Sequence, residues 1–90
     1  MDSAGFVKVV EEKLKPFAPI LISGIIKKQL TSLNSTPETL TPENTEVFIT
    51  KVSNALEMFL GPKGKKKVKI MMLKEFRKHA PEYFERTSIV

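Results

Sequence analysis

The sequence predicts an all-α fold, a compact four-helix domain with a short C-terminal helical turn. Three observations predict it. Apolar residues recur at spacings of three and four in four segments, as expected for helices that bury one face. Residues that cap or break helices stand between these segments. The 90 residues, 41% of them hydrophobic, suffice for one core, so residues 1–90 are expected to form a single domain.

The first predicted helix runs from Ser3 to about Lys15. Asp2 or Ser3 can cap its N-terminus, and Pro16 ends it because the residue before a proline avoids the helical conformation. Its expected apolar stripe consists of Phe6, Val10, Leu14 and Phe17.

The second predicted helix begins near Pro19 and continues to about Leu33, and apolar residues occupy most of its circumference. We therefore expect it to be the central helix of the domain. Gly24 costs about 1 kcal/mol relative to alanine in a helix interior. A close approach of a neighbouring helix is the expected reason for this glycine.

Turn-forming residues dominate the connection 34–41, where Ser35 and Glu38 have capping-box spacing for a single turn. Thr41 is expected to cap a third helix with Pro42 at its first position, and Gly61 followed by Pro62 ends it. The buried stripe predicted for this helix is Phe48, Val52, Leu56 and Phe59.

A fourth helix is predicted from Lys63 to His79. A short strand through residues 67–70 is the alternative, because these residues alternate, but residues 71–73 are all apolar and break the alternation. The helix has one apolar side, formed by Val68, Met72, Phe76 and His79. Beyond it, residues 81–86 are expected to form a last turn that lays Tyr83 or Phe84 on the core, and residues 87–90 are expected to fray.

Several classes of function lack their usual residues. The chain has no cysteine, so it cannot form a disulfide or a thiolate metal site, and we expect no cofactor. His79 is the only imidazole, and its place at a helix end indicates a capping role. We therefore predict that the protein is not an enzyme and has no small-molecule substrate.

Membrane association is not predicted. The longest nearly continuous apolar run, residues 17–26, is about half of the ~20 residues that a spanning helix needs. The first residues also lack the basic and apolar regions of a secretory signal, so the expected location is cytoplasmic.

Positive charge is concentrated in one part of the chain. The net charge is +5, yet residues 61–79 carry eight basic side chains against one acid, Glu75. The eight are Lys63, Lys65, Lys66, Lys67, Lys69, Lys74, Arg77 and Lys78. On the predicted helix, Lys66, Lys67, Lys74, Arg77 and Lys78 share one arc, which also contains Ile70.

The turn before this helix is suited to an anion. Lysines at a helix start are unfavourable beside the positive end of the dipole unless an anion binds there. Backbone N–H groups at a helix start bind phosphate, and Gly61 and Gly64 would let a ligand approach closely.

The spacing of residues 61–64 is similar to the GxxG loop of KH domains, which clamps a single-stranded nucleic-acid backbone. It more loosely resembles the glycine-containing hairpin of helix-hairpin-helix motifs, which has one residue between its glycines where this chain has two. A KH domain also needs three strands, which the sequence does not predict. The resemblance implies a way of contacting a phosphate backbone, and we assign no family from it.

The leading hypothesis is a small non-enzymatic nucleic-acid-binding module of low sequence selectivity. Its predicted contact residues are Gly61, Lys63, Gly64, Lys65, Lys66, Lys67, Lys69, Lys74 and Lys78. One alternative is a lysine-rich turn that only keeps the protein soluble. Another is an accessory subunit that docks a helical face onto a larger protein partner, using apolar residues that one core leaves uncovered. Candidates for such uncovered residues are Val7, Ile49, Ile70 and Met71.

Overall fold

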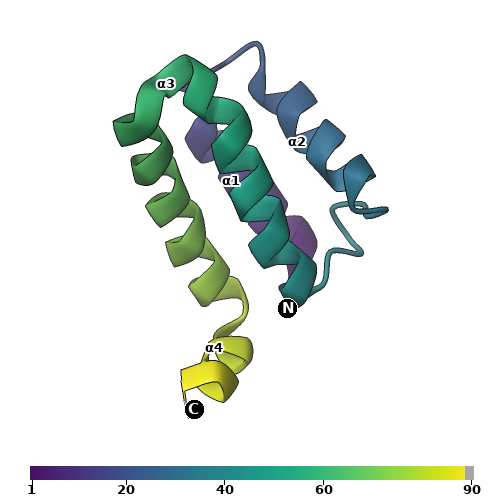
Figure 1. Cartoon of the computed structure of the whole chain (residues 1–90). Coiled ribbons are helices and arrows are strands. Elements are labelled where there is room, and N and C mark those ends of the chain that lie inside the picture. The colour runs from purple at the N-terminus through teal and green to yellow at the C-terminus, as the bar shows by residue number, and fades with distance from the viewer. Residues whose placement is uncertain (89–90) are drawn as a thin grey trace.

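The computed structural model describes residues 1–88, with side chains through Phe84, and these residues form four helices and no strand. The helices are α1 (Ser3–Leu14), α2 (Ile22–Ser32), α3 (Pro42–His79) and α4 (Pro81–Ser88). A bend at Gly61 divides α3 into two arms, which we call arm 1 (residues 42–60) and arm 2 (residues 62–79). Figure 1 shows that α1, α2, arm 1 and arm 2 run alternately up and down. The predicted all-α fold, with four helical segments and a short C-terminal helix, is confirmed.

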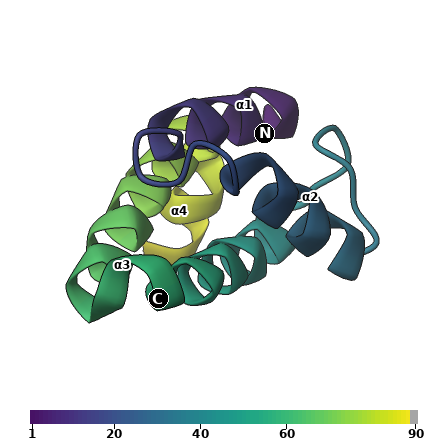
Figure 2. The same ribbon diagram turned by 90° about the horizontal axis from the view of Figure 1, so that it is seen from above.

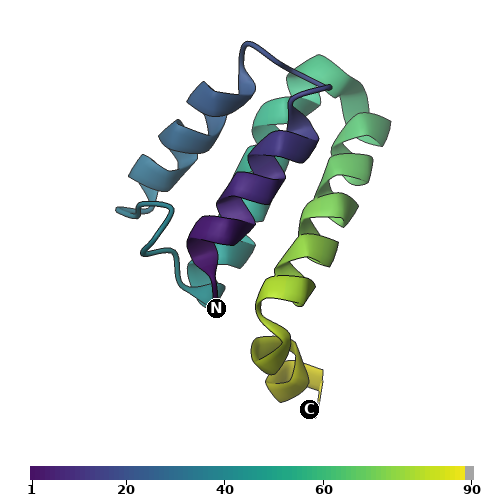
Figure 3. The ribbon, with the colours of Figure 1, turned by 180° about the vertical axis from the view of Figure 1, so that it is seen from behind.

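The middle of the bundle is formed by α1 and arm 1, with α2 on one side and arm 2 on the other (Figures 1, 2 and 3). Three fully buried phenylalanines join α1 to the two arms of α3. The ring of Phe6 in α1 lies 6.4 Å from that of Phe48 in arm 1 and 6.1 Å from that of Phe76 in arm 2, both in edge-on geometry. Such aromatic pairs add about 0.5–1.5 kcal/mol each to the free energy of burial. Arm 2 is therefore fixed to the core through its last turns.

Local capping signals act as the sequence predicts. The Asp2 carboxylate accepts a hydrogen bond of 3.0 Å from the Gly5 backbone N–H at the start of α1. Thr41 caps arm 1 by accepting a bond of 3.2 Å from the N–H of Asn44. These bonds satisfy backbone donors that a helix start leaves without partners.

The position predicted for the second helix is wrong. Helix α2 begins at Ile22, three residues after Pro19, and its N-cap residue makes no side-chain capping bond. It lies at the edge of the bundle, and only a narrow stripe, Ile22, Ile26 and Leu30, is buried in it. The apolar residues before Ile22 lie in the connection from α1. The high apolar content of this region therefore does not make α2 the central helix.

The expected close approach at Gly24 is also wrong, and the substitution Gly24→Ala should stabilise the protein. The residue is exposed in α2, and a Cβ built there meets nothing within 4 Å. Alanine loses less backbone entropy on folding, so we expect a gain of about 0.5–1 kcal/mol. For a domain of this size that raises the melting temperature by roughly 2–8 °C, which calorimetry can measure. A lower melting temperature would contradict the open surroundings of this position.

The capping pair predicted in the connection 34–41 does not form. The Ser35 hydroxyl donates to the carbonyl of Leu33, at 3.1 Å. One residue further along, Thr39 Oγ1 accepts a bond of 2.8 Å from the N–H of Thr36. The two threonines close a turn that is not part of a helix. The Thr39 hydroxyl, one position after Glu38, thus accepts from the N–H three residues earlier, as the capping pattern expected of the Glu38 side chain.

Two members of the predicted apolar stripes lie outside the core. Phe17 is exposed because α1 ends at Leu14, which takes Phe17 out of helical register with the stripe. Phe59 is exposed at the end of arm 1, where Leu60 packs against the core in its place. Phe17 belongs to the α1–α2 connection and Phe59 lies just before the bend in α3, and Figures 1 and 3 show that this connection and the bend share one end of the bundle.

The C-terminal helix packs its aromatic residues on arm 2, as predicted. The rings of Tyr83 and Phe84 lie 5.5 and 4.8 Å from the ring of Phe76. The Tyr83 hydroxyl donates to the Glu46 carboxylate in arm 1, at 2.8 Å. The helix extends to Ser88, further than the predicted turn. The fraying expected for residues 87–90 stays a prediction, because residues 87 and 88 belong to α4 in this structure and residues 89–90 lie outside the described part.

Candidate nucleic-acid interface

The lysine-rich segment follows a sharp bend in α3. Gly61 has φ 73° and ψ 176°, a combination that is almost confined to glycine, and Pro62 begins arm 2 immediately after it. A Cβ at Gly64 would overlap the Cβ of Leu60, so this glycine lets the two arms meet closely. Both glycines predicted to admit a ligand are therefore required by the bend itself. The space around Gly61 is nevertheless open.

The substitution Gly61→Ala should destabilise the protein, opposite in sign to Gly24→Ala. The strain of an alanine at this φ and ψ costs about 1–3 kcal/mol although no atom blocks the added methyl group. Urea unfolding of the two variants beside the wild type measures both signs in one series. A Gly61→Ala protein as stable as the wild type would show that the bend does not need this conformation.

Arm 2 turns most of its basic side chains outward. We call the exposed set the basic face: Lys63, Lys66, Lys67, Lys74, Arg77 and Lys78. Their spacings of three, four and seven place them along one side of the helix. Two other predicted contact residues, Lys65 and Lys69, are half-buried and lie outside the basic face, and Lys65 Nζ lies 3.5 Å from the Glu57 carboxylate. The structure thus brings most of the predicted lysines onto one surface.

The one acid of this segment is buried and paired with lysines. The Glu75 side chain is only 5% exposed and its carboxylate lies 2.6 Å from Lys13 Nζ of α1 and 3.4 Å from Lys78 Nζ. The hydrogen bond from Lys13 holds the pKa of Glu75 below its usual range, although burial acts in the opposite direction. Because Glu75 is turned inward, the exposed side of arm 2 carries positive charge alone. The sequence did not indicate this pairing between distant residues.

This buried carboxylate predicts a contribution to acid sensitivity. A carboxyl group with a lowered pKa in the folded protein stabilises the fold at pH above its ordinary value of 4.5, and this stabilisation is lost as the pH falls below it. The unfolding free energy should therefore fall as the pH drops below 4.5. In the Glu75→Gln variant this fall should be smaller, as chemical denaturation at each pH can show. Identical pH profiles for the two proteins would contradict the role of the ion pair.

An apolar depression interrupts the basic face. Ile70 and Leu73 are 45% and 39% exposed, and with Phe84 of α4 they line a hollow of about 300 Å³ that Lys74 and Arg77 border. The Arg77 guanidinium lies over the Phe84 ring, with 5.2 Å between its Cζ atom and the ring centroid. The sequence placed Ile70 within the basic arc. It gave no signal for the contribution of Phe84, which comes from a separate helix.

A second exposed surface lies at the end of the bundle where α3 bends. We call it the apolar end, and its residues are Phe17, Ile20, Leu21, Met58 and Phe59. Ile20 and Met58 are 90% and 89% exposed, which is unusual for large apolar side chains in a domain this small. Figures 1 and 3 show that the two segments that carry these residues share this end.

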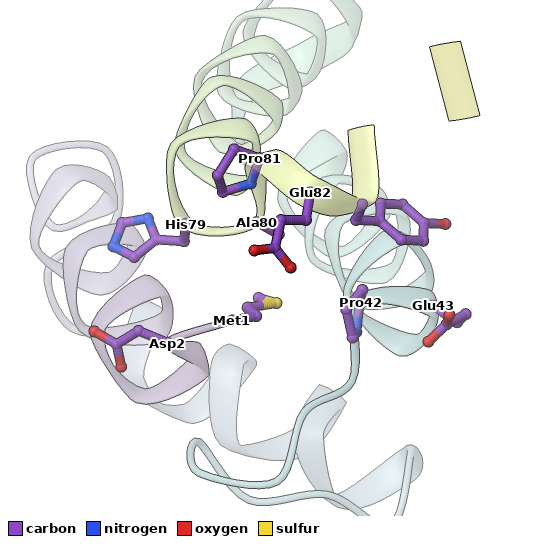
Figure 4. A pocket seen from close by; sticks show the side chains of 9 residues that line it. Met1, Asp2, Pro42, Glu43, His79, Ala80, Pro81 and Glu82 are labelled. Carbon is purple, nitrogen blue, oxygen red and sulfur yellow. The ribbon is translucent and has the colours of Figure 1, made fainter. Parts of the chain in front are cut away.

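The opposite end has an open hollow of about 410 Å³ between the N-terminus, the start of α3 and α4 (Figure 4). Asp2, Glu43 and Glu82 contribute carboxylates to its rim, but Asp2 already caps α1. His79 also borders it, with Nδ1 2.8 Å from the Glu75 carbonyl, which confirms its predicted bond at the helix end. Within the described residues, no group of three or more such side chains is arranged to hold a metal ion.

The described residues include no helix that is both long and apolar enough to cross a membrane. Comparison of the chain with protein-family models, with curated proteins and with solved structures gives no match.

Proposed function

We propose that the chain is a small non-enzymatic module that binds nucleic acid through the basic face of arm 2. The observation that carries this proposal is the segregation of charge. Six basic side chains share one exposed side of a helix, while the only acid of the segment is buried beneath them. From Lys63 to Lys78 the face is about 22 Å long at 1.5 Å per residue, which is long enough to contact several successive phosphates.

The internal contacts of the basic face leave it available for phosphates. Among the described residues, Lys63, Lys66, Lys67 and Lys74 form no ion pair, so binding an anion would break none. Lys78 also pairs with Glu75, but its Nζ lies 3.4 Å from the carboxylate, whereas Lys13 Nζ lies at 2.6 Å. Contacts of this kind read the phosphate backbone and carry little sequence information. The proposed partner implies an intracellular setting.

Electrophoretic mobility shifts with single- and double-stranded DNA and RNA test the proposal directly. We expect binding at about 50 mM salt that weakens steeply toward ~200 mM, because each phosphate contact releases bound counterions. The slope of log affinity against log salt then reports the number of contacts. Absence of binding to every nucleic acid at the lower salt concentration would refute the proposal and leave the lysines as a solubilising surface.

The apolar end favours a second candidate function, docking onto a larger protein partner. Of the four residues that the sequence suggested for this role, Val7 and Ile49 are buried in the core and Met71 packs against it, whereas Ile70 is exposed. Ile20 and Met58 take their place as the most exposed large apolar residues. Affinity capture tests this candidate. It is supported if a protein partner binds the wild type and variants of the basic face but does not bind the double variant Ile20→Ser/Met58→Ser. A partner retained equally by all of them would exclude the apolar end.

A further inference from the structure

The hollow within the basic face has a composition that phosphate contacts alone do not require. Ile70, Leu73 and Phe84 give it an apolar floor, and Lys74 and Arg77 border it. Exposing two large aliphatic side chains to water is unfavourable, and lysines at these positions would serve phosphate binding better. The volume of about 300 Å³ lies at the lower limit of small-molecule pockets. The hollow is therefore suited to one flat, mostly apolar group attached to a phosphate chain.

Arg77 gives the hollow a planar surface. Its guanidinium is held over the Phe84 ring, and Phe84 is in turn held edge-on against the buried ring of Phe76 at 4.8 Å. An arginine supported in this way is restrained in position, and because its side chain remains exposed its planar guanidinium is available to a ligand. Guanidinium planes and aromatic rings are the surfaces on which proteins stack the bases of single strands.

We propose that the basic face binds single-stranded nucleic acid and that the hollow holds one unstacked base against Arg77. This inference rests on the proposed function and names its ligand more closely. Lys74 borders the hollow, Lys78 lies one helical turn beyond Lys74, and the lysines near the bend lie in the other direction along the same face, so phosphates on either side of the base meet positive charge. A duplex keeps its bases stacked and paired, and it cannot place one in the hollow without first unpairing it.

Fluorescence anisotropy with three labelled probes tests the inference. The probes are a 15-nucleotide oligothymidylate, an abasic strand with the same number of phosphates, and a duplex of the same length. We expect the wild type to bind the oligothymidylate about tenfold more tightly than the abasic strand, as a single stacked base can provide. The duplex should also bind more weakly than the oligothymidylate, despite its higher charge density.

Two variants separate stacking from charge. Arg77→Lys keeps the positive charge and removes the planar group, so the oligothymidylate should bind only as well as the abasic strand, with the same salt slope. Leu73→Ser, at an exposed position, should have the same effect by making the floor polar. The control Lys28→Arg also exchanges one exposed cation for another, but on α2 and outside the basic face, and it should bind like the wild type.

The outcomes distinguish this inference from the proposed function. Equal binding of the oligothymidylate and the abasic strand, or a preference for the duplex, would overturn the inference and leave nucleic-acid binding intact. An Arg77→Lys variant that retains the full preference for bases would also overturn it. Failure of all three probes to bind at about 50 mM salt would overturn the proposed function and the inference together. In that case, sedimentation of the protein together with phosphatidylserine vesicles would indicate that the basic face binds an anionic membrane surface instead.

Discussion

Replacing Lys63, Lys66 and Lys67 together with glutamate should abolish nucleic-acid binding without unfolding the protein. The three side chains are exposed and form no ion pair among the described residues. Loss of about three phosphate contacts should flatten the log affinity against log salt slope by roughly 2–3 units. Repulsion by the new acids should bring the loss of affinity to more than about 100-fold at low salt.

The fold should tolerate this change because glutamate is a good helix former and Lys63 lies in the first turn of arm 2, where the helix dipole favours an acid. The matched control is Lys8, Lys27 and Lys28 to glutamate, which alters the net charge equally at exposed positions on α1 and α2. We expect only a few-fold loss of affinity from the control. Circular dichroism and a salt series on both triple variants make the comparison. Equal losses would show that net charge, and not the basic face, governs binding.

The substitution Phe6→Ala should have the largest effect on stability. Phe6 has no exposed surface, and its ring lies within 6.4 Å of the rings of Phe48, Phe76 and His79. Removing a fully buried phenylalanine side chain costs about 3–5 kcal/mol. A domain of this length is stable by roughly 5–13 kcal/mol in total. The variant should therefore lose a large part of the stability of the domain, as denaturant titration can measure.

A matched control is the same substitution at Phe59, whose ring is exposed at the apolar end. Phe59→Ala should change the unfolding free energy by less than about 1 kcal/mol. If the two variants lose similar stability, the contact of Phe6 with both arms of α3 is not the centre of the core. A small loss of stability in the Phe6→Ala variant would also show that Phe6 is not the centre of the core.

Sequence reasoning located most helix ends because these depend on bonds between residues close in the chain. The carboxylate of Asp2 and the hydroxyl of Thr41 each bond to an N–H three residues away, and His79 bonds to a carbonyl four residues back. The predicted boundary at Gly61 also holds, although arm 2 follows it directly and without a loop. Capping preferences are strong enough to be read without knowledge of the remaining structure.

The basic face could be predicted in outline for a similar reason. Helical periodicity alone places Lys66, Lys67 and Lys74 on one side of arm 2, and the structure confirms their exposure. Periodicity could not show that Glu75 is neutralised by Lys13, 62 residues earlier in the chain. It also could not show that Phe84 completes a hollow beside Ile70, because that contact depends on the direction in which α4 folds back.

By itself, the sequence determined the helical class, most of the helix ends and the outward direction of the lysines, all of which follow from interactions within a few residues. Only the tertiary structure decided that α2 lies at the edge, that Gly24 touches no neighbour, and that Phe59 is left exposed while Ile49 is buried. Several helices of this chain have an apolar stripe that suits a central position. Which of them occupies it depends on how all the stripes pack together at once, and no segment carries that information alone.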